Sequence, residues 1–226
     1  MKKTCYKDPV SARKEALREQ LALAKKIRLT PLERPPRYVA GVDCAFVEDK
    51  IIAVAVVFRV PELICVEEKW VIEETEFPYI PGLLSFREGP ALVSVIKRLS
   101  TKPDVILFDG QGIAHPRRVG IATHIGILLD VPTIGCAKSK LVGEYEEPED
   151  HRFAHTPLVY KEEVVGVVLR TKKGVLPIFV SPGHRITVED ALRVVTLCVA
   201  RYRLPEPVRR ADLLSKRLRK EYLASG

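Results

Sequence analysis

The chain has 226 residues, of which 46% are hydrophobic and 29% are charged, and its formal net charge is +8 at pH 7. This length suits one core, so we expect residues 1–226 to form a single domain. The positive charge favours an anionic partner without identifying it, and the sequence has no run of eighteen apolar residues and no secretory signal, so we expect a cytoplasmic protein.

The N-terminal half is predicted to contain one helix followed by three strands. Apolar residues recur at helical spacing from Asp8 to Ile27, and Asp8 before Pro9 is typical of a helix start. Three apolar runs follow, and the segment Glu48-Asp49-Lys50 joins the first two runs in a hairpin. These runs predict strands over residues 37–46, 51–59 and 63–74.

The second half of the chain alternates helices and strands. A helix is predicted to begin near Pro90, and the polar segment from Glu144 to His155 is predicted to be a long loop. Thr187 with Asp190 resembles a capping box at a helix start. The remaining predicted elements are strands 104–109, 132–136, 164–170 and 175–180, and helices from about Pro116 to Leu129, over 188–202 and from about Pro207.

The order of these elements predicts an α/β fold with a central mixed sheet flanked by helices. Hairpin-connected strands come first and helical crossovers follow, which suits a ribonuclease H-like fold. A doubly wound fold would begin with βαβ units. The turn Asp109-Gly-Gln-Gly112 also lacks the third glycine of a dinucleotide-binding motif, where His115 stands, and this disfavours an oxidoreductase.

Three acidic residues occupy positions that suit a metal site. Asp43 lies inside an apolar strand, Asp109 ends another strand, and Glu88 follows a turn with two prolines. A carboxylate buried in a strand is costly unless it is paired or binds a cation, and Mg²⁺ prefers oxygen ligands. The alternatives are a solvated edge-strand carboxylate for Asp43, a turn residue for Asp109 and a residue before a helix start for Glu88.

Other metal chemistry is not indicated. The five cysteines are scattered and none is paired as Cys-x-x-Cys, so we predict neither a zinc site nor a disulfide framework. His151 and His155 are four residues apart, but their surroundings are loop-like, and we expect no metal there.

Three long strings in the chain resemble the endonuclease V family. They are Pro78-Tyr-Ile-Pro-Gly-Leu-Leu-Ser-Phe-Arg-Glu-Gly-Pro90, Asp109-Gly-Gln-Gly-Ile-Ala-His-Pro-Arg-Arg-Val-Gly120 and Asp130-Val-Pro-Thr-Ile-Gly-Cys-Ala-Lys-Ser-Lys140. The similarity extends from about Ala12 to Pro207. It implies a ribonuclease H-like fold and a Mg²⁺-dependent endonuclease of DNA repair, with Mn²⁺ as an alternative ion. Such an enzyme cuts the second phosphodiester bond 3′ to deoxyinosine and leaves a 3′-hydroxyl and a 5′-phosphate.

The resemblance also assigns catalytic residues. It implies that Asp43, Glu88 and Asp109 hold the metal and that Asp212, in the last helix, is a fourth catalytic group. For Asp212 the alternative is an exposed carboxylate in the early turns of a helix, where a negative charge is favourable anyway.

Substrate contacts follow from the same resemblance. It places Gly82, Leu84, Gly110 and Ile121 around the inosine base. The prolines make the turn Pro78-Tyr79-Ile80-Pro81 rigid, and we predict that Tyr79 at its tip is a wedge that unstacks a base. The alternative is a turn buried under the next helix.

Basic residues are predicted to contact phosphates. Arg117 and Arg118 are predicted in the first turn of a helix, where its free N–H groups and His115 would complete a phosphate site. The alternative is two solvated arginines. Lys138 is a further predicted phosphate contact, and His184 is predicted to orient a phosphate or water, with a structural role as an equal alternative.

Two other classes of function stay open at this point. One is another ribonuclease H-like nuclease, acting on branched structures or RNA–DNA hybrids. The other is a non-catalytic nucleic-acid-binding module, which would gain nothing from a buried carboxylate cluster. The expected partner is inosine-containing DNA, with single-stranded inosine-containing RNA as an open alternative, and a monomer is favoured.

Overall fold

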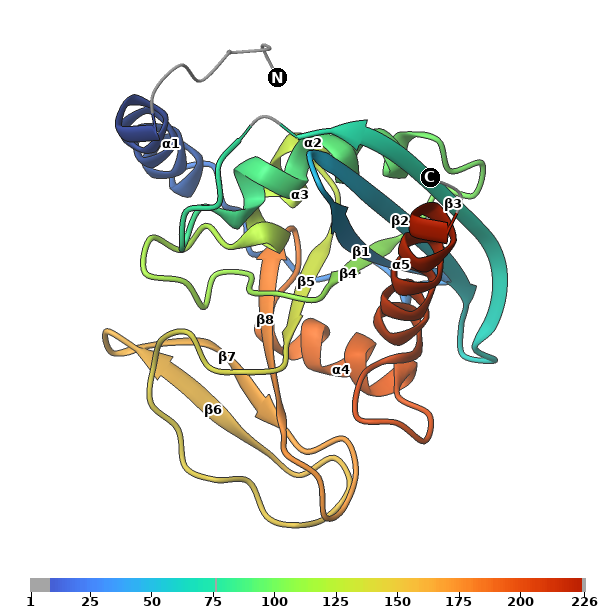
Figure 1. The fold of residues 1–226 in the computed structure, drawn as a ribbon. Helices are drawn as coiled ribbons and strands as arrows, with labels where there is room; N and C mark the ends of the chain where they lie inside the picture. Colours follow the sequence, from blue (N-terminus) through green and yellow to red (C-terminus); the bar gives the residue numbers. More distant parts are fainter. Residues whose placement is uncertain (1–8, 76, 225–226) are drawn as a thin grey trace.

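The computed structural model describes residues 9–75 and 77–224. The elements of this part are, in chain order, α1 (Pro9–Ala24), β1 (Tyr38–Val47), β2 (Lys50–Arg59), β3 (Ile64–Glu74), α2 (Leu84–Lys97), β4 (Val105–Phe108), α3 (Ile121–Leu129), β5 (Thr133–Ala137), β6 (His155–Tyr160), β7 (Glu163–Leu169), β8 (Ile178–His184), α4 (Val188–Cys198) and α5 (Glu206–Ala224). The strands form one sheet with helices on both of its faces (Figure 1).

The sheet has a parallel centre with antiparallel strands on both sides. Its strand order is β3-β2-β1-β4-β5-β8-β7-β6. β1 pairs in parallel with β4, and β4 with β5, while all the other neighbours are antiparallel. Helices α2 and α3 make the two crossovers that parallel pairing requires. This topology confirms the predicted mixed sheet.

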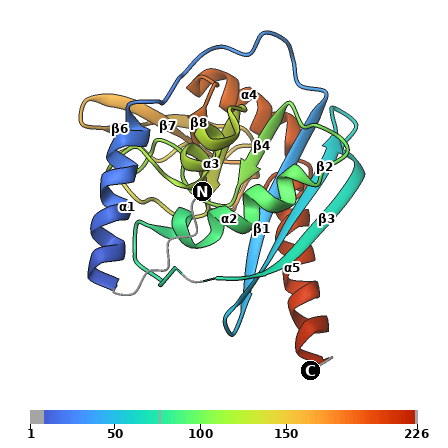
Figure 2. The same ribbon diagram turned by 90° about the horizontal axis from the view of Figure 1, so that it is seen from above.

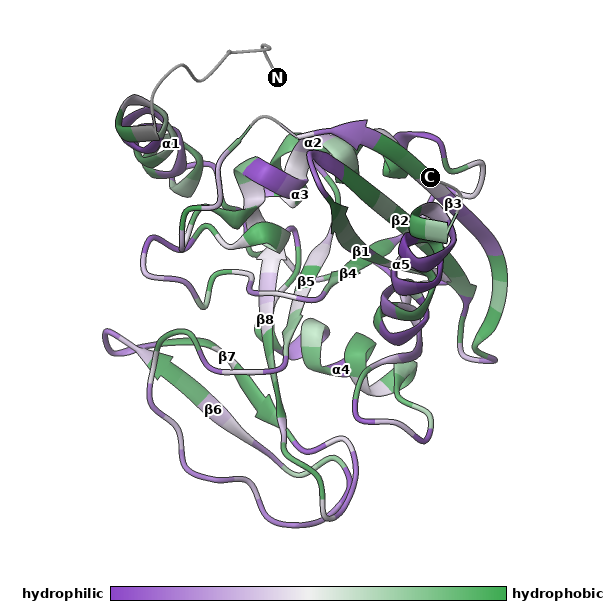
Figure 3. Ribbon diagram, in the orientation of Figure 1, coloured by the Kyte–Doolittle hydropathy of each residue, from purple (hydrophilic) through white to green (hydrophobic). Residues whose placement is uncertain are grey.

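Helices cover both faces of the sheet. Helices α2 and α3 share one hydrophobic cluster with β1, β2 and β4, in which Ala40, Leu92 and Ile125 are buried. On the other face α4 packs on β5, β7 and β8, and α5 packs on β2. Figure 3 shows the outcome of this packing: the central strands are coloured as hydrophobic, while the outer side of α5 is hydrophilic. The two-sided burial explains why β2 is almost continuously apolar.

Most predicted elements are confirmed. The ends of the first three strands lie within one residue of the predicted ends, and the strand that precedes Asp109 also forms. The helix start at Thr187 is confirmed as well, since Thr187 Oγ1 accepts a hydrogen bond from the backbone N–H of Asp190 at 3.1 Å, which is one half of the predicted capping box. The last predicted helix forms as α5.

Two helix starts differ from the prediction. Helix α2 begins at Leu84, and Pro90 lies inside it, because buried Phe86 and Gly89 pack the first turns against the core in spite of the N–H that proline lacks. Helix α3 begins at Ile121, five residues later than predicted. Arg118 has φ +61°, which no α-helix allows, so the two arginines lie in a turn before the helix.

The N- and C-terminal thirds hold three further differences. Strand β6 follows the predicted loop and was not predicted; it contains Pro157, which is tolerated because β6 is an edge strand. Helix α4 ends at Cys198 rather than at residue 202. Helix α1 ends at Ala24, and its predicted start at Asp8 lies outside the described residues. Within the described ranges, no helix is long and apolar enough to cross a membrane.

Candidate active site

Asp43 and Asp109 lie side by side where β4 ends beside the middle of β1. Val42 of β1 pairs with Phe108 of β4; Asp43 is the next residue within β1, and Asp109 is the first residue after β4. The shared register of this parallel pair therefore brings both aspartates to the same level of the sheet, at the end of β4. These residues are 66 positions apart in the sequence, and the pairing of β1 with β4 brings them together.

Helix α5 brings a third carboxylate, Asp212, to the same place. A Cβ atom on Gly41 would lie 2.1 Å from the Pro207 backbone, so the missing side chain lets α5 lie against β1. Ser215, one turn after Asp212, donates a hydrogen bond to Asp43 Oδ2 at 2.5 Å. Its oxygen also lies 3.0 Å from the Asp212 carbonyl oxygen. Ser215 was not predicted, although its spacing of three from Asp212 is the signal that marks the same helix face.

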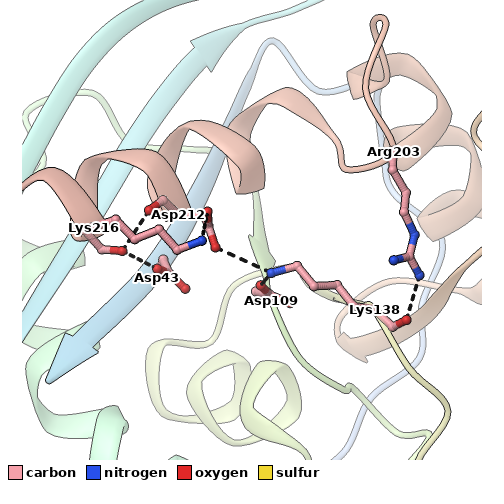
Figure 4. A network of polar contacts seen from close by, with 7 residues as sticks. Asp43, Asp109, Lys138, Arg203, Asp212 and Lys216 are labelled. Atoms are coloured by element: carbon pink, nitrogen blue, oxygen red, sulfur yellow. Dashed lines mark hydrogen bonds and ion pairs between the residues drawn. The ribbon is translucent and has the colours of Figure 1, made fainter.

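Lys138, directly after β5, lies between two of these carboxylates. Its Nζ is 2.5 Å from Asp109 Oδ2 and 3.5 Å from Asp212 Oδ1 (Figure 4). Lys216 Nζ binds the other oxygen of Asp212 at 2.6 Å. Burial lowers the pKa of Lys138, but its two carboxylate partners raise it by more, so the amine stays protonated. Lys138, which was predicted to contact a phosphate, therefore carries its positive charge at the acidic cluster.

Arg203 holds the backbone that carries Lys138. Its guanidinium donates to the Lys138 carbonyl oxygen at 2.7 Å and to the Pro177 carbonyl oxygen at 2.8 Å (Figure 4). The prediction from sequence did not include Arg203, because nothing in its local pattern indicates a contact across 65 residues.

The acidic cluster carries more negative charge than its protein partners neutralise. Burial is the main cause that raises the pKa of Asp43 to about 6; the carboxylates of Asp109 and Asp212 add to the rise, and the hydrogen bond from Ser215 opposes it. Glu88, on α2, is affected in the same way, since burial first, and then Asp43 and Asp109, raise its pKa to about 8. These charge interactions show that the four predicted catalytic residues lie in one cluster.

The donor atoms of this cluster fit a hard cation. Asp43, Glu88 and Asp109 offer only oxygen ligands, and a divalent ion among them would stabilise the charged carboxylates of Asp43 and Glu88, whose pKa values are raised by burial and by the neighbouring carboxylates. In the described part of the chain, no three His, Cys, Asp or Glu side chains are already arranged to hold an ion. Asp109 instead binds Lys138, and Asp43 binds Ser215. Metal binding here would require these two contacts to rearrange.

The turn from Pro78 to Gly82 presents Tyr79 to solvent. Tyr79 is 70% exposed, which fits the predicted tip and not a turn buried under a helix. Gly82 ends the turn with φ +76°, a conformation that favours glycine. Leu84, also predicted near the base, is partly buried at the first position of α2.

Two more of the residues predicted around the base are neighbours. A Cβ atom on Gly110 would lie 2.7 Å from Ile121 Cγ2, so glycine is required where the chain leaves Asp109 and passes α3. The structure therefore joins the predicted base contacts at Gly110 and Ile121 directly to the acidic cluster.

His115 lies beneath Gly82 and does not act as a cation. It is 3% exposed, and burial, followed by the charge of Arg117, lowers its pKa to about 4 against a hydrogen bond with the Gly82 backbone. The Nδ1 atom accepts a hydrogen bond from the Arg117 backbone N–H at 3.2 Å. The predicted phosphate site on the first helical turn is therefore wrong in its geometry.

Of two further residues predicted to contact the substrate, Arg118 is partly exposed and His184 is buried. Arg118 is partly exposed and forms an ion pair with Glu163 of β7. His184 is 2% exposed and pairs with Thr133 at the start of β5, the end of that strand opposite Lys138. It bonds to Asp130 at 3.2 Å. The structure does not bring His184 to the acidic cluster, and this position favours its structural alternative.

Among the described residues, the cysteines, His151 and His155 belong to no group of side chains that could hold a metal. Cys44, Cys65, Cys136 and Cys198 are free thiols, while Cys5 lies outside the described residues. His151 pairs with Glu149, and neither that histidine nor His155 belongs to a metal-binding group within the ranges that are described.

Comparison with known proteins gives one consistent result. The Endonuclease V family model matches residues 21–213. Endonuclease V of Geotalea uraniireducens is 49% identical over 211 residues, which cover 93% of this chain and 90% of that protein. The family match spans the turn with Tyr79, the acidic cluster and Lys138.

Solved structures agree with the sequence match. Endonuclease V from Streptomyces avermitilis has a TM-score of 0.88 at 41% identity, covering 93% of this chain and 94% of that one. Ciona intestinalis Endonuclease V, in complex with a 24mer DNA containing an inosine followed by a ribo-adenosine, has a TM-score of 0.79 at 29% identity over 92% of this chain and 98% of that one. These neighbours share the predicted ribonuclease H-like fold. The chain therefore belongs to the endonuclease V family and is a nuclease that acts on phosphodiester bonds.

Proposed function

We propose that this nuclease cuts DNA beside deoxyinosine, at the second phosphodiester bond 3′ to the lesion, and that it serves DNA repair. The observation that carries the proposal is the placing of Asp43 and Asp109 next to each other, directly after the paired residues Val42 and Phe108, with Lys138 and Asp212 beside them. The Ciona intestinalis relative, solved with inosine-containing DNA, supports the choice of substrate.

Asp43, Glu88 and Asp109 are the residues that would hold Mg²⁺, or Mn²⁺ as the alternative ion. When bound, such an ion activates a water and stabilises the oxygen that leaves, which yields a 3′-hydroxyl and a 5′-phosphate. Lys138 would then exchange its carboxylate partner for a phosphate oxygen, because its ammonium group donates equally well to either anion. Asp212 would be the fourth carboxylate of the site, and its ion pairs with Lys138 and Lys216 hold it in place.

The base would be read next to this cluster. Inosine differs from adenine on its pairing edge by a carbonyl and a ring N–H, which fixed backbone groups at Gly82 and Gly110 could distinguish. Leu84 and Ile121 would contact the face of the base. The exposed Tyr79 would fill the gap left in the stack. Pro78, Ile80 and Pro81 would keep that turn rigid.

Inosine-containing single-stranded RNA is a second candidate substrate. The DNA bound by the Ciona intestinalis relative carries a ribo-adenosine after its inosine. A ribonucleotide at that position would place a 2′-hydroxyl near the bond to be cut. We therefore propose that RNA with inosine is cut at the same site.

One nicking assay tests these proposals. Matched strands containing inosine or adenine, as duplex DNA, single-stranded DNA and single-stranded RNA, are incubated with the full chain in Mg²⁺, Mn²⁺ or EDTA. Undamaged branched DNA and an undamaged RNA–DNA hybrid are included as controls. We expect cuts only in inosine-containing strands and only with a divalent ion. Equal cutting of adenine controls, branched DNA or RNA–DNA hybrids would replace the inosine proposal with a broader nuclease, and no cutting at all would indicate a binding module.

A further inference from the structure

Gln20 of α1 is a buried amide whose hydrogen-bonding groups are all in use. Its side chain has no exposed surface. The Nε2 atom donates to the Gly82 carbonyl oxygen at 3.1 Å and to the Val119 carbonyl oxygen at 3.0 Å. The Oε1 atom accepts from Arg117 Nε at 2.6 Å. A buried amide that is satisfied in this way specifies the relative position of its partners.

The partners of Gln20 belong to two separate loops. Gly82 ends the turn that presents Tyr79, whereas Arg117 and Val119 lie between β4 and α3. Arg117 Nη2 also donates to the Gly82 carbonyl oxygen at 3.1 Å, and His115 bonds to the Gly82 backbone. Three side chains thus converge on one backbone group of the turn. Gln20 is the one of them that comes from outside both loops.

Apolar packing holds α1 in the position that this contact needs. Ala12 and Ala16 are buried in one cluster with Phe77, Leu83 and Phe86, which flank the turn on both sides. Figure 2 shows α1 standing beside the chain that leads into α2, at the margin of the molecule. The helix therefore closes over the turn, and Gln20 supplies the polar contacts of the same interface.

We infer that Gln20 is a positioning residue for recognition of inosine, an inference that rests on the proposed function. Recognition through backbone groups at Gly82 leaves no side chain that could adapt by changing its rotamer. The turn must therefore be held in place by its supports. Gln20 would hold the turn from Pro78 to Gly82 against the loop that follows Gly110. The distance between these two sides of the base pocket would then stay constant.

The test compares Gln20→Met with Leu17→Ala. Methionine keeps the length of the side chain but removes all three hydrogen bonds, whereas Leu17→Ala weakens the apolar packing of the same helix and keeps them. A third variant, Gln20→Glu, retains an acceptor for Arg117 but loses both donors. Each variant is first checked for a cooperative thermal transition, so that unfolded protein is excluded.

We expect Gln20→Met to lower kcat/KM on inosine-containing duplex by at least about tenfold, because the loss of a single hydrogen bond between buried partners has about this effect and three are lost. Gln20→Glu should resemble Gln20→Met, because the lost donors are the groups that reach Gly82. Binding to undamaged duplex should change little. In EDTA, a 2-aminopurine beside the inosine should fluoresce less with Gln20→Met than with wild type, because the base is turned out less often.

The outcomes separate this inference from the proposed function. If wild-type protein cuts inosine and adenine strands equally, the proposed function fails. If wild type discriminates and Gln20→Met keeps full discrimination and the full 2-aminopurine signal, the positioning role is overturned. The positioning role would also be overturned if kcat/KM fell in Gln20→Met and Leu17→Ala only in proportion to the drop in melting temperature of each variant. Gln20 would then only stabilise the fold.

Discussion

Ser215 Oγ lies 2.5 Å from Asp43 Oδ2, so the last helix supports the carboxylate of the first strand. The bond crosses 172 positions of sequence and lies at the point where α5 approaches β1. It is the larger of two hydrogen bonds, the other from the Cys44 backbone, that oppose the rise in the pKa of Asp43 caused by burial and by neighbouring carboxylates. Ser215 therefore stabilises the charged form of a proposed metal ligand.

Replacing Ser215 tests this support. Ser215→Ala should reduce cleavage of inosine-containing DNA by about tenfold, because a hydrogen bond to a charged group contributes on the order of 1.5–3 kcal/mol. More Mg²⁺ should recover part of the loss, since the ion competes with protons for Asp43. Leu213→Ala, at an exposed position of the same helix, is the control and should keep full activity. Equal Mg²⁺ dependence of wild type and Ser215→Ala would contradict the prediction.

Replacing the proposed ligands themselves should have a larger effect. Asp43→Asn or Asp109→Asn keeps the shape of the side chain but removes a charge, and cleavage should fall about a thousandfold or more. Binding to inosine-containing DNA should persist, as a gel-shift assay can measure. Full activity of Asp43→Asn would refute the proposed metal site.

The raised pKa values predict how stability without divalent ions depends on pH. Folded protein keeps protons on Asp43 up to about pH 6 and on Glu88 up to about pH 8, whereas the unfolded chain releases them near about pH 4. The stabilisation is complete below the unfolded pKa and is lost as pH rises through the folded values. In thermal melts in EDTA, the contribution of Asp43 and Glu88 to the melting temperature should therefore fall between about pH 4 and pH 8.

A variant and an added ion isolate that contribution. Glu88→Gln should flatten the fall in melting temperature toward pH 8, because the amide does not titrate. Mg²⁺ added at pH 8 should raise the melting temperature of wild type and should raise that of Glu88→Gln less. Identical pH curves for wild type and Glu88→Gln would show that burial and the neighbouring carboxylates do not raise the pKa of Glu88.

Arg118 provides a test of phosphate binding. Arg118→Ala should weaken binding to damaged and undamaged strands about equally and reduce the slope of log affinity against log salt by about 1. Arg34→Ala is a matched control, because Arg34 also pairs with a carboxylate, Asp104, but at the opposite end of β4 from Asp109. A loss confined to inosine-containing strands would assign Arg118 to base recognition.

The exposed tip of the turn predicts a difference between duplex and single strand. Tyr79→Ala should reduce cleavage of double-stranded inosine-containing DNA more than that of single-stranded DNA, because unstacking is costly only in the duplex. Tyr79→Phe keeps the ring and should retain activity. The melting temperature should hardly change, since Tyr79 is 70% exposed. A sharp drop in stability with equal loss on both substrates would identify Tyr79 as a structural residue.

Local patterns were sufficient for much of the fold. The strands that position Asp43 and Asp109 follow from apolar runs, one with Asp43 inside it and one with Asp109 directly after it, and two-sided burial makes such runs hard to mistake. The rigid turn with Tyr79 follows from its prolines. Helix starts were less certain, because Pro90 and Pro116 both favour a first helical turn, yet neither begins a helix. Packing of Phe86 and the left-handed Arg118 decided those boundaries.

Local spacing and residue type are enough to predict most of the helices and strands and the three acids that suit a metal, although not strand β6 or the starts of α2 and α3. The contacts between distant groups follow only from the folded chain: Lys138 with Asp109, Ser215 with Asp43, and Gln20 with Gly82. It also directed His184 to the far end of β5. The physical reason is that strand register and helix packing depend on the whole core, so no local pattern records which loops will share one edge of the sheet.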